Sequence, residues 1–175
     1  MARYSFVDEW LVPASPEAVY ALLSRPVRYP EWWGDAFLRG EGDEGPAAPG
    51  KRARLLTRGL LPYRLRWELV CLEAAPPTRL VSGITGDFEG EGIWTIAEAP
   101  GGGTRAVLEW NVDVRKPLVR ELTPLLRPLF AWNHGWAMRR GHERIVSLLE
   151  TGAGRRSPLL PKLVEARAQA IPPVG

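Results

Sequence analysis

The sequence predicts an α+β fold in which a curved antiparallel sheet wraps around one long C-terminal helix. Three observations support it. Five stretches alternate apolar and polar residues, turn residues separate these stretches, and a final segment repeats apolar residues at helical spacing. Each strand then has one face to bury, and one long helix is available to cover those faces.

Length and composition fit one globular domain. The chain has 175 residues, of which 45% are hydrophobic and 25% charged, and this length is enough for one sizeable core. No apolar run approaches the roughly 18 residues that span a bilayer. The N-terminal stretch MARYSFVDEW carries acids where a signal peptide is apolar. We therefore expect a cytoplasmic protein with no integral membrane segment.

Charge and cysteine content exclude several classes of site. The net charge is +3, and the basic residues mostly alternate with acidic or apolar ones, which is not the basic patch of a nucleic-acid binder. Cys71 is the only cysteine, so no intrachain disulfide and no cysteine-cluster metal site can form. The motifs GxSxG, GxxxxGK[ST] and GxGxxG at a strand-to-helix junction are missing too. We expect no metal and no cofactor.

The chain opens with a strand and a short helix. Residues 4–12 alternate and predict a strand with Phe6, Trp10 and Val12 on one face. Ser15 has the character of an N-cap, and Pro16 after it suits the first helical position. Apolar residues at helical spacing follow, and Pro26 is expected to end the helix.

Two adjacent tryptophans follow this helix in a turn that Pro30 can start. Trp32 and Trp33 must point in different directions, so one core cannot easily take both rings. We expect one ring in the core and the other at the mouth of a ligand cavity.

A loop and a run of strands come next. The stretch GEGDEGPAAPG at 40–50 has the composition of a loop. The strands are predicted at 51–58, 63–75, 78–86, 88–98 and 103–115. Their clean alternation is typical of an antiparallel sheet with one solvated face.

The C-terminal part switches to helical spacing. Pro124 and Pro128 predict a broken or looped lead-in, with the regular helix at about 129–150. We expect one domain at 1–152 and a tail at 153–175, with a short helix as one option for the tail.

Several segments resemble the START-like (SRPBCC) superfamily, which has the helix-grip fold. They are VPASPEAVYALLSRPVRYPEWW at 12–33, FEGEGIWTI at 88–96 and WNHGWAMRRGHERIVSLLE at 132–150. The superfamily includes polyketide cyclases and lipid-transport-like proteins. The resemblance implies an internal apolar cavity for a lipid, quinone, polyketide or similar ligand, and it leaves the chemistry open.

Tryptophans dominate the predicted inner faces. The alternatives are plain core packing or the lining of an aromatic cavity, and a solid core of so many large rings would be hard to fill without voids. The residues predicted to line a ligand cavity are Trp10, Trp33, Trp67, Leu69, Trp94, Trp110, Phe130, His134 and Met138.

Two titratable residues are candidates for acid–base chemistry. His134 falls on the buried face of the helix, where it is either a satisfied structural residue or a general acid or base. Asp8 shares the face of Phe6 and Trp10, and it could fix a ligand's polar group, pair with an arginine or lie at a frayed strand end. His142 is expected to be solvated.

Trp132 and Trp136 are neighbours on the otherwise polar side of the helix. With Trp32 they could form a gate over the cavity entrance, or they could contact the tail or a second subunit, so the oligomeric state stays open and includes a dimer.

Three functions remain in competition. The first is binding or transfer of a hydrophobic small molecule. The second is an enzyme like the polyketide cyclases or aromatases, with His134 or Asp8 moving a proton. The third is an interaction module that uses exposed tryptophans.

Overall fold

A computed structural model describes residues 3–60, 63–115 and 117–150, without the side chains of Arg3 and of residues 117–127. The expected tail at 153–175 lies outside the described residues. Seven strands form one antiparallel sheet in the order β1-β7-β6-β5-β4-β3-β2. With the long helix that follows them, they confirm the predicted α+β helix-grip fold.

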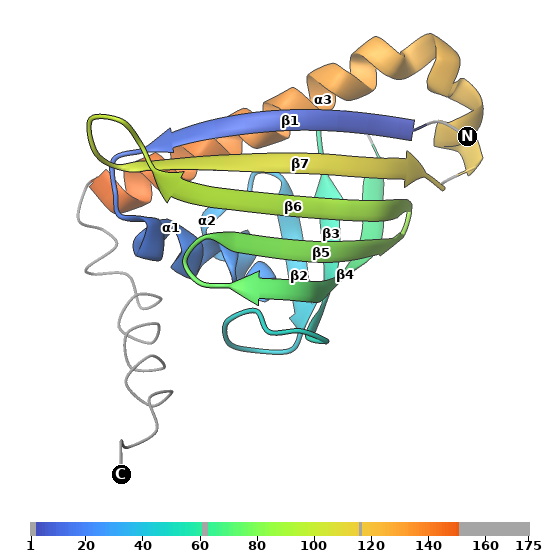
Figure 1. Cartoon of the computed structure of the whole chain (residues 1–175). Coiled ribbons are helices and arrows are strands. Elements are labelled where there is room, and N and C mark those ends of the chain that lie inside the picture. Colours follow the sequence, from blue (N-terminus) through green and yellow to red (C-terminus); the bar gives the residue numbers. More distant parts are fainter. Residues whose placement is uncertain (1–2, 61–62, 116, 151–175) are drawn as a thin grey trace.

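The elements follow each other along the chain much as predicted. They are β1 (Arg3–Val12), α1 (Pro16–Leu23), the 3-10 helix η1 (Pro26–Arg28), α2 (Tyr29–Trp32), β2 (Phe37–Gly42), β3 (Arg52–Arg58), β4 (Arg64–Ala75), β5 (Arg79–Gly86), β6 (Phe88–Glu98), β7 (Thr104–Val114) and α3 (Pro117–Glu150). Figure 1 shows the sheet curving, so that β2 and β3 run across the direction of β6 and β7. Residues of α3 such as Met138 and Ile145 join the core on the buried face of this sheet.

The start of α1 follows its capping residues. The Ser15 hydroxyl accepts a hydrogen bond from the backbone N–H of Ala18 at 3.3 Å, and Pro16 occupies the first helical position. The helix ends at Leu23, before Pro26.

Strand β2 was not predicted, because its sequence FLRGEG has the composition of a loop. It pairs with β3 from Phe37 to Gly42, so the predicted loop at 40–50 begins as a strand. Gly40 explains the misleading composition: a Cβ there would collide with the carbonyl oxygen of Val27. The glycine therefore allows β2 to pack closely against η1.

Helix α3 starts earlier than predicted. It is helical from Pro117, through Pro124 and Pro128, where a broken or looped lead-in was expected. Figure 1 shows this first part bending relative to the rest. Proline removes one hydrogen bond and kinks a helix without necessarily ending it, which accounts for both features. None of the described helices is long and apolar enough to cross a bilayer.

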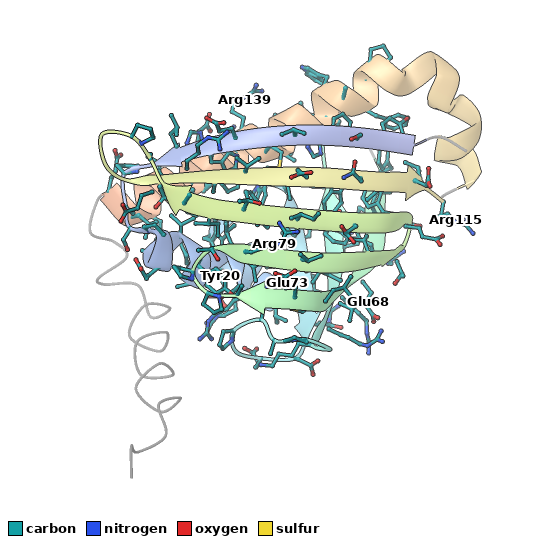
Figure 2. All side chains as sticks on the ribbon, in the orientation of Figure 1. Tyr20, Glu68, Glu73, Arg79, Arg115 and Arg139 are labelled. Carbon is teal, nitrogen blue, oxygen red and sulfur yellow. The ribbon has the colours of Figure 1, made fainter. Side chains whose placement is uncertain are left out.

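The outer face of the sheet carries the polar half of the alternation. Ion pairs link neighbouring strands there, with Arg105 and Glu9 at 2.5 Å between β7 and β1, and Arg79 and Glu73 at 3.4 Å between β5 and β4. Figure 2 shows Glu73 and Arg79 on this face. The apolar residues lie on the inner face, where they form the core and the cavity wall.

Candidate ligand cavity

A cavity of about 190 Å³ lies in the core, with residues of the sheet, the Trp33 turn and α3 on its wall. The wall is largely apolar and rich in aromatic rings. Its rings are those of Tyr4, Phe6, Tyr29, Trp33, Phe37, Tyr63, Trp67, Phe88, Trp94, Trp110 and Phe130. Apolar and aromatic walls with few polar groups are typical of small-molecule sites.

The structure places nearly all the predicted lining residues on this wall. Those found there are Trp33, Trp67, Leu69, Trp94, Trp110, Phe130, His134 and Met138. Trp10 is not on the wall, which corrects its predicted placement. It is 2% exposed and packs against Trp33 and Trp94, with ring centroids 5.2 and 5.0 Å apart. Trp10 thus supports the wall from behind.

Contacts between rings hold the wall in place. The indole N–H of Trp67 donates to the Thr57 hydroxyl at 3.0 Å. The Trp67 ring also meets Trp110 edge-on, with centroids 5.4 Å apart and planes at 75°. Buried aromatic rings prefer this arrangement, and the hydrogen bond satisfies the polar end of the indole.

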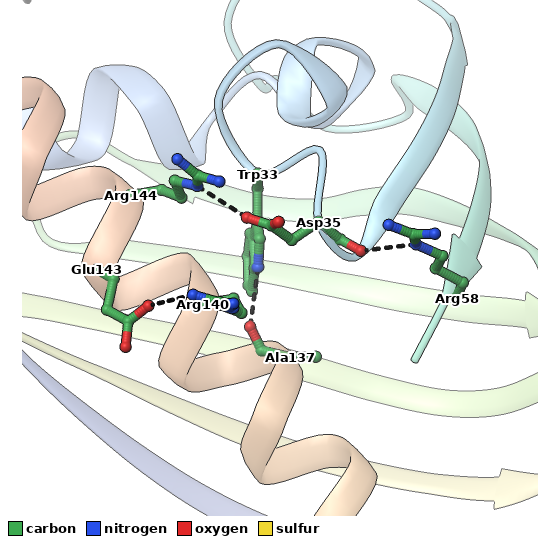
Figure 3. Close-up of polar contacts among 7 residues, drawn as sticks. All are labelled: Trp33, Asp35, Arg58, Ala137, Arg140, Glu143 and Arg144. Carbon is green, nitrogen blue, oxygen red and sulfur yellow. Dashed lines mark hydrogen bonds and ion pairs between the residues drawn. The ribbon is translucent and has the colours of Figure 1, made fainter. Parts of the chain in front are cut away.

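Trp33 joins the wall to α3. Its indole N–H donates to the Ala137 carbonyl oxygen at 2.9 Å, as Figure 3 shows. Gly141 makes this approach feasible, because a Cβ there would collide with the Trp33 ring and lie 2.8 Å from Cη2 of Trp10. The helix therefore presents bare backbone to both rings.

Asp35 fixes the turn that carries Trp33. Its carboxylate accepts from Nε of Arg144 on α3 at 2.7 Å, and its backbone carbonyl accepts from Nε of Arg58 on β3 at 3.0 Å. Both contacts are drawn in Figure 3. The hydrogen bond from Arg144 lowers the pKa of the Asp35 carboxyl below its usual value.

The two acid–base candidates form a pair. Nε2 of His134 lies 2.7 Å from Oδ2 of Asp8, and the two side chains are 18% and 22% exposed. Phe6 stacks on the imidazole with centroids 4.2 Å apart. With Asp8 accepting from Nε2–H, a neutral His134 has its lone pair on Nδ1. His134 is on the cavity wall, whereas Asp8 is not.

His142 is bound and not simply solvated as predicted. Its Nε2 lies 2.8 Å from the Leu11 carbonyl oxygen, and its ring stacks on Trp10 with centroids 5.9 Å apart. The edge of the helix face at this point is covered by β1.

The Trp32–Trp33 pair departs from prediction, because both rings are buried, at 7% and 4% exposed. They stack with centroids 5.4 Å apart. Among the described residues, the ring contacts of Trp32 are to Tyr29 and Trp33. Trp132 is 54% exposed and Trp136 packs at the edge of the core, and neither is on the cavity wall. The structure does not bring Trp32, Trp132 and Trp136 together as a gate.

Residues 3–150 match the family described as polyketide cyclase / dehydrase and lipid transport. The chain belongs to this family. No curated protein matches it. The family match over residues 3–150 confirms the resemblance stated from the sequence.

Solved structures share the fold. The Zhui aromatase/cyclase from Streptomyces sp. R1128 is 12% identical with a TM-score of 0.70, covering 89% of this chain and 99% of that one. The protein TTHA0849 from Thermus thermophilus is 23% identical with a TM-score of 0.64, covering 82% and 98%. The di-domain ARO/CYC BexL from the BE-7585A biosynthetic pathway is 20% identical with a TM-score of 0.61, covering 82% and 50%. The chain thus spans half the length of the di-domain protein.

Sequence reasoning missed several polar residues on the cavity wall, and three of them come from different parts of the chain. They are Tyr4 on β1, Tyr63 before β4 and Asn133 on α3. Oδ1 of Asn133 accepts from the backbone N–H of Leu60 at 2.7 Å, so it fixes the β3–β4 loop to α3. The alternation that places Phe6 inward also places Tyr4 inward and could have found it. No cluster of three metal-ligating side chains occurs in the part of the chain that the structure describes.

Proposed function

We propose that the protein binds, and can carry, a hydrophobic small molecule in the cavity between the sheet and α3. The observation that carries this proposal is the apolar wall, rich in aromatic rings, around about 190 Å³ of space. Burial of apolar ligand surface against such a wall is favourable, and it needs no catalytic group. Family membership supports the same function.

The cavity volume bears on ligand size. An apolar cavity of roughly 150 Å³ is large enough to take up benzene. A cavity of about 190 Å³ therefore suits one or two rings with the wall as it stands. A lipid, a quinone with a tail or an extended polyketide is larger than this space, so the wall rings would have to move before it fits. The cavity volume therefore favours the smaller ligands.

Native mass spectrometry of the protein purified from its own host tests the proposal. A co-purifying apolar molecule of defined mass, released on denaturing extraction, is the expected result. An empty protein whose tryptophan fluorescence also ignores lipids, quinones and aromatic polyketides contradicts the proposal.

A second candidate function is an enzyme like the aromatase/cyclases. The Asp8–His134 contact at 2.7 Å favours it, because a carboxylate that orients an imidazole beside a ligand cavity is a common general-base arrangement. In this role His134 Nδ1 accepts a proton from the ligand, and Asp8 stabilises the resulting imidazolium.

A His134→Ala variant separates the two functions once the host ligand is known. Loss of turnover with retained ligand binding indicates the enzyme. Retained conversion in the variant, or no conversion by the wild type, excludes this role for His134.

A further inference from the structure

The two edge strands of the sheet differ in how they are protected. Strand β2 forms one edge, where it shifts register between Phe37 and Arg39 and packs on η1 through Gly40. Strand β1 forms the other edge, and it pairs with β7 in unbroken register from Arg3 to Val12. Natural proteins usually shorten, bend or cover an edge strand, because its free backbone groups can pair with another strand. β2 follows this rule, whereas β1 is long and regular.

The open side of β1 carries backbone N–H and C=O groups. Both groups of a residue point to the same side of an antiparallel strand, and the side alternates along the chain. The Val12 carbonyl oxygen faces Gly103 at the start of β7, where a Cβ would lie 2.6 Å from it. The Leu11 carbonyl oxygen therefore faces the open side, where Nε2 of His142 lies 2.8 Å away. By the same alternation, the open side also receives the N–H and C=O groups of Ser5, Val7 and Glu9.

The middle of this edge is accessible. Figure 1 shows α3 behind β1, on the inner side of the sheet, and α3 meets the edge at Leu11 through His142. Val7 is 70% exposed, more than any other large apolar residue that the structure describes. No turn, loop or helix backbone bonds to the edge groups of Ser5, Val7 or Glu9 in the described part of the chain. An added strand could therefore reach these groups.

Charge along the strand favours one kind of partner. β1 has a basic residue at its start, Arg3, and an exposed acidic residue, Glu9, towards its end. Two β1 strands that pair antiparallel bring these opposite charges together, whereas parallel pairing brings like charges together. Opposite charges on facing residues stabilise a strand pair, and like charges destabilise it. The edge is therefore complementary to a second copy of itself.

We propose that the open edge of β1 pairs antiparallel with the same edge of a second copy of the chain, across a two-fold axis at Phe6. Arg3 then faces the partner's Glu9, and Ser5 faces the partner's Val7, with each pair exchanging two hydrogen bonds. An axis at Glu9 would instead place the two Glu9 residues opposite each other. Ser5, Val7 and Glu9 are not on the cavity wall, so this interface is separate from the proposed ligand site.

Sedimentation equilibrium across micromolar to millimolar concentrations tests this interface. We expect the wild type to form a dimer that dissociates on dilution. Val7→Pro should raise the dissociation constant at least about tenfold, because it removes the N–H that bonds to the partner's Ser5 at both symmetry-related positions. Proline is tolerated on an edge strand where its N–H side is open, so the β1–β7 pairing remains. Circular dichroism melting checks the folding of the variant.

Leu72→Ser is the matched control for non-specific association. Leu72 is also exposed, at 52%, but it lies on β4, an interior strand of the sheet. Its substitution should leave the dissociation constant unchanged. Amide hydrogen exchange of the wild type gives a second readout, in which the Val7 and Glu9 amides exchange more slowly at high protein concentration. This readout decides the matter if Val7→Pro does not fold.

Three results overturn the inference. The first is a wild type that stays monomeric at every concentration. The second is a dimer that persists in Val7→Pro or in which exchange of the Val7 amide is independent of concentration. The third is a Leu72→Ser variant that dissociates as readily as Val7→Pro, which would mean that association depends on exposed apolar surface in general. None of these results bears on ligand binding in the cavity.

Discussion

Gly141 shows how one residue sets the shape of the cavity wall. A methyl group there would collide with the buried Trp33 ring and approach Trp10 to 2.8 Å. Alanine favours helices over glycine by about 1 kcal/mol, but overpacking a well-packed core typically costs about 1–3 kcal/mol. The difference between these two effects leads us to expect that Gly141→Ala lowers the free energy of unfolding by up to about 2 kcal/mol in urea denaturation.

Gly135 on the same helix is the matched control. A Cβ at this position meets nothing within 4 Å, so Gly135→Ala should raise the free energy of unfolding by about 0.5–1 kcal/mol. Equal effects of the two substitutions would show that the Trp33 ring does not rest on the backbone at Gly141.

The sequence predicted which single residues point inward better than it predicted which residues contact each other. Strand alternation placed Trp67 and Trp110 inward, and helical spacing placed His134 inward, because both patterns are local. The partners Asp8 and His134 are 126 positions apart, so only the register of α3 against β1 brings them together. Each was named a candidate, but no local signal indicated their contact.

Among the elements, the turn between α2 and β2 depends on its ties to α3. Asp35 pairs with Arg144, and this hydrogen bond lowers the pKa of the Asp35 carboxyl below its usual value. A carboxyl whose pKa is depressed on folding stabilises the folded state above its unfolded pKa, and this stabilisation is lost as the pH falls through the folded pKa. The contact therefore acts at neutral pH and is lost in acid.

We expect Asp35→Asn to lower the free energy of unfolding by up to about 1 kcal/mol at pH 7, since both partners are partly exposed. The difference from wild type should shrink once the pH is below the pKa of folded Asp35. Urea unfolding of both proteins, at pH 7 and at a pH below the pKa of folded Asp35, measures this difference. Glu143→Gln, which breaks a pair within α3, is the control. A deficit for Asp35→Asn that is independent of pH would contradict the assigned cause.

Elements that combine conflicting signals were the ones mispredicted. The glycines of β2 indicate a loop by composition, yet Gly40 is needed for contact with η1. Pro124 and Pro128 indicate a break, yet α3 continues through them. In both cases tertiary packing outweighed local preference. The other strands had no such conflict, and their predicted bounds agree closely with the structure.

For the molecule as a whole, the proposed binding depends on the cavity being open to a ligand. Leu69 of β4 is on the cavity wall, and its neighbour Val70 has its side chain on the other face of the sheet. We expect Leu69→Trp to reduce binding of the two-ring probe indane at least about tenfold by filling the space, while Val70→Trp leaves it unchanged. Equilibrium dialysis measures both. Equal affinities in the two variants would place the ligand elsewhere.

The most direct test of an internal ligand cavity uses the tryptophans as reporters. Indole N–H signals in ¹H–¹⁵N correlation spectra are assigned by substitution and followed while indane is added. We predict that the signals of the wall residues Trp33, Trp67, Trp94 and Trp110 shift together and saturably, while that of the exposed Trp132 stays in place. Shifts confined to Trp132 and Trp136, with the wall residues silent, would contradict an internal ligand cavity.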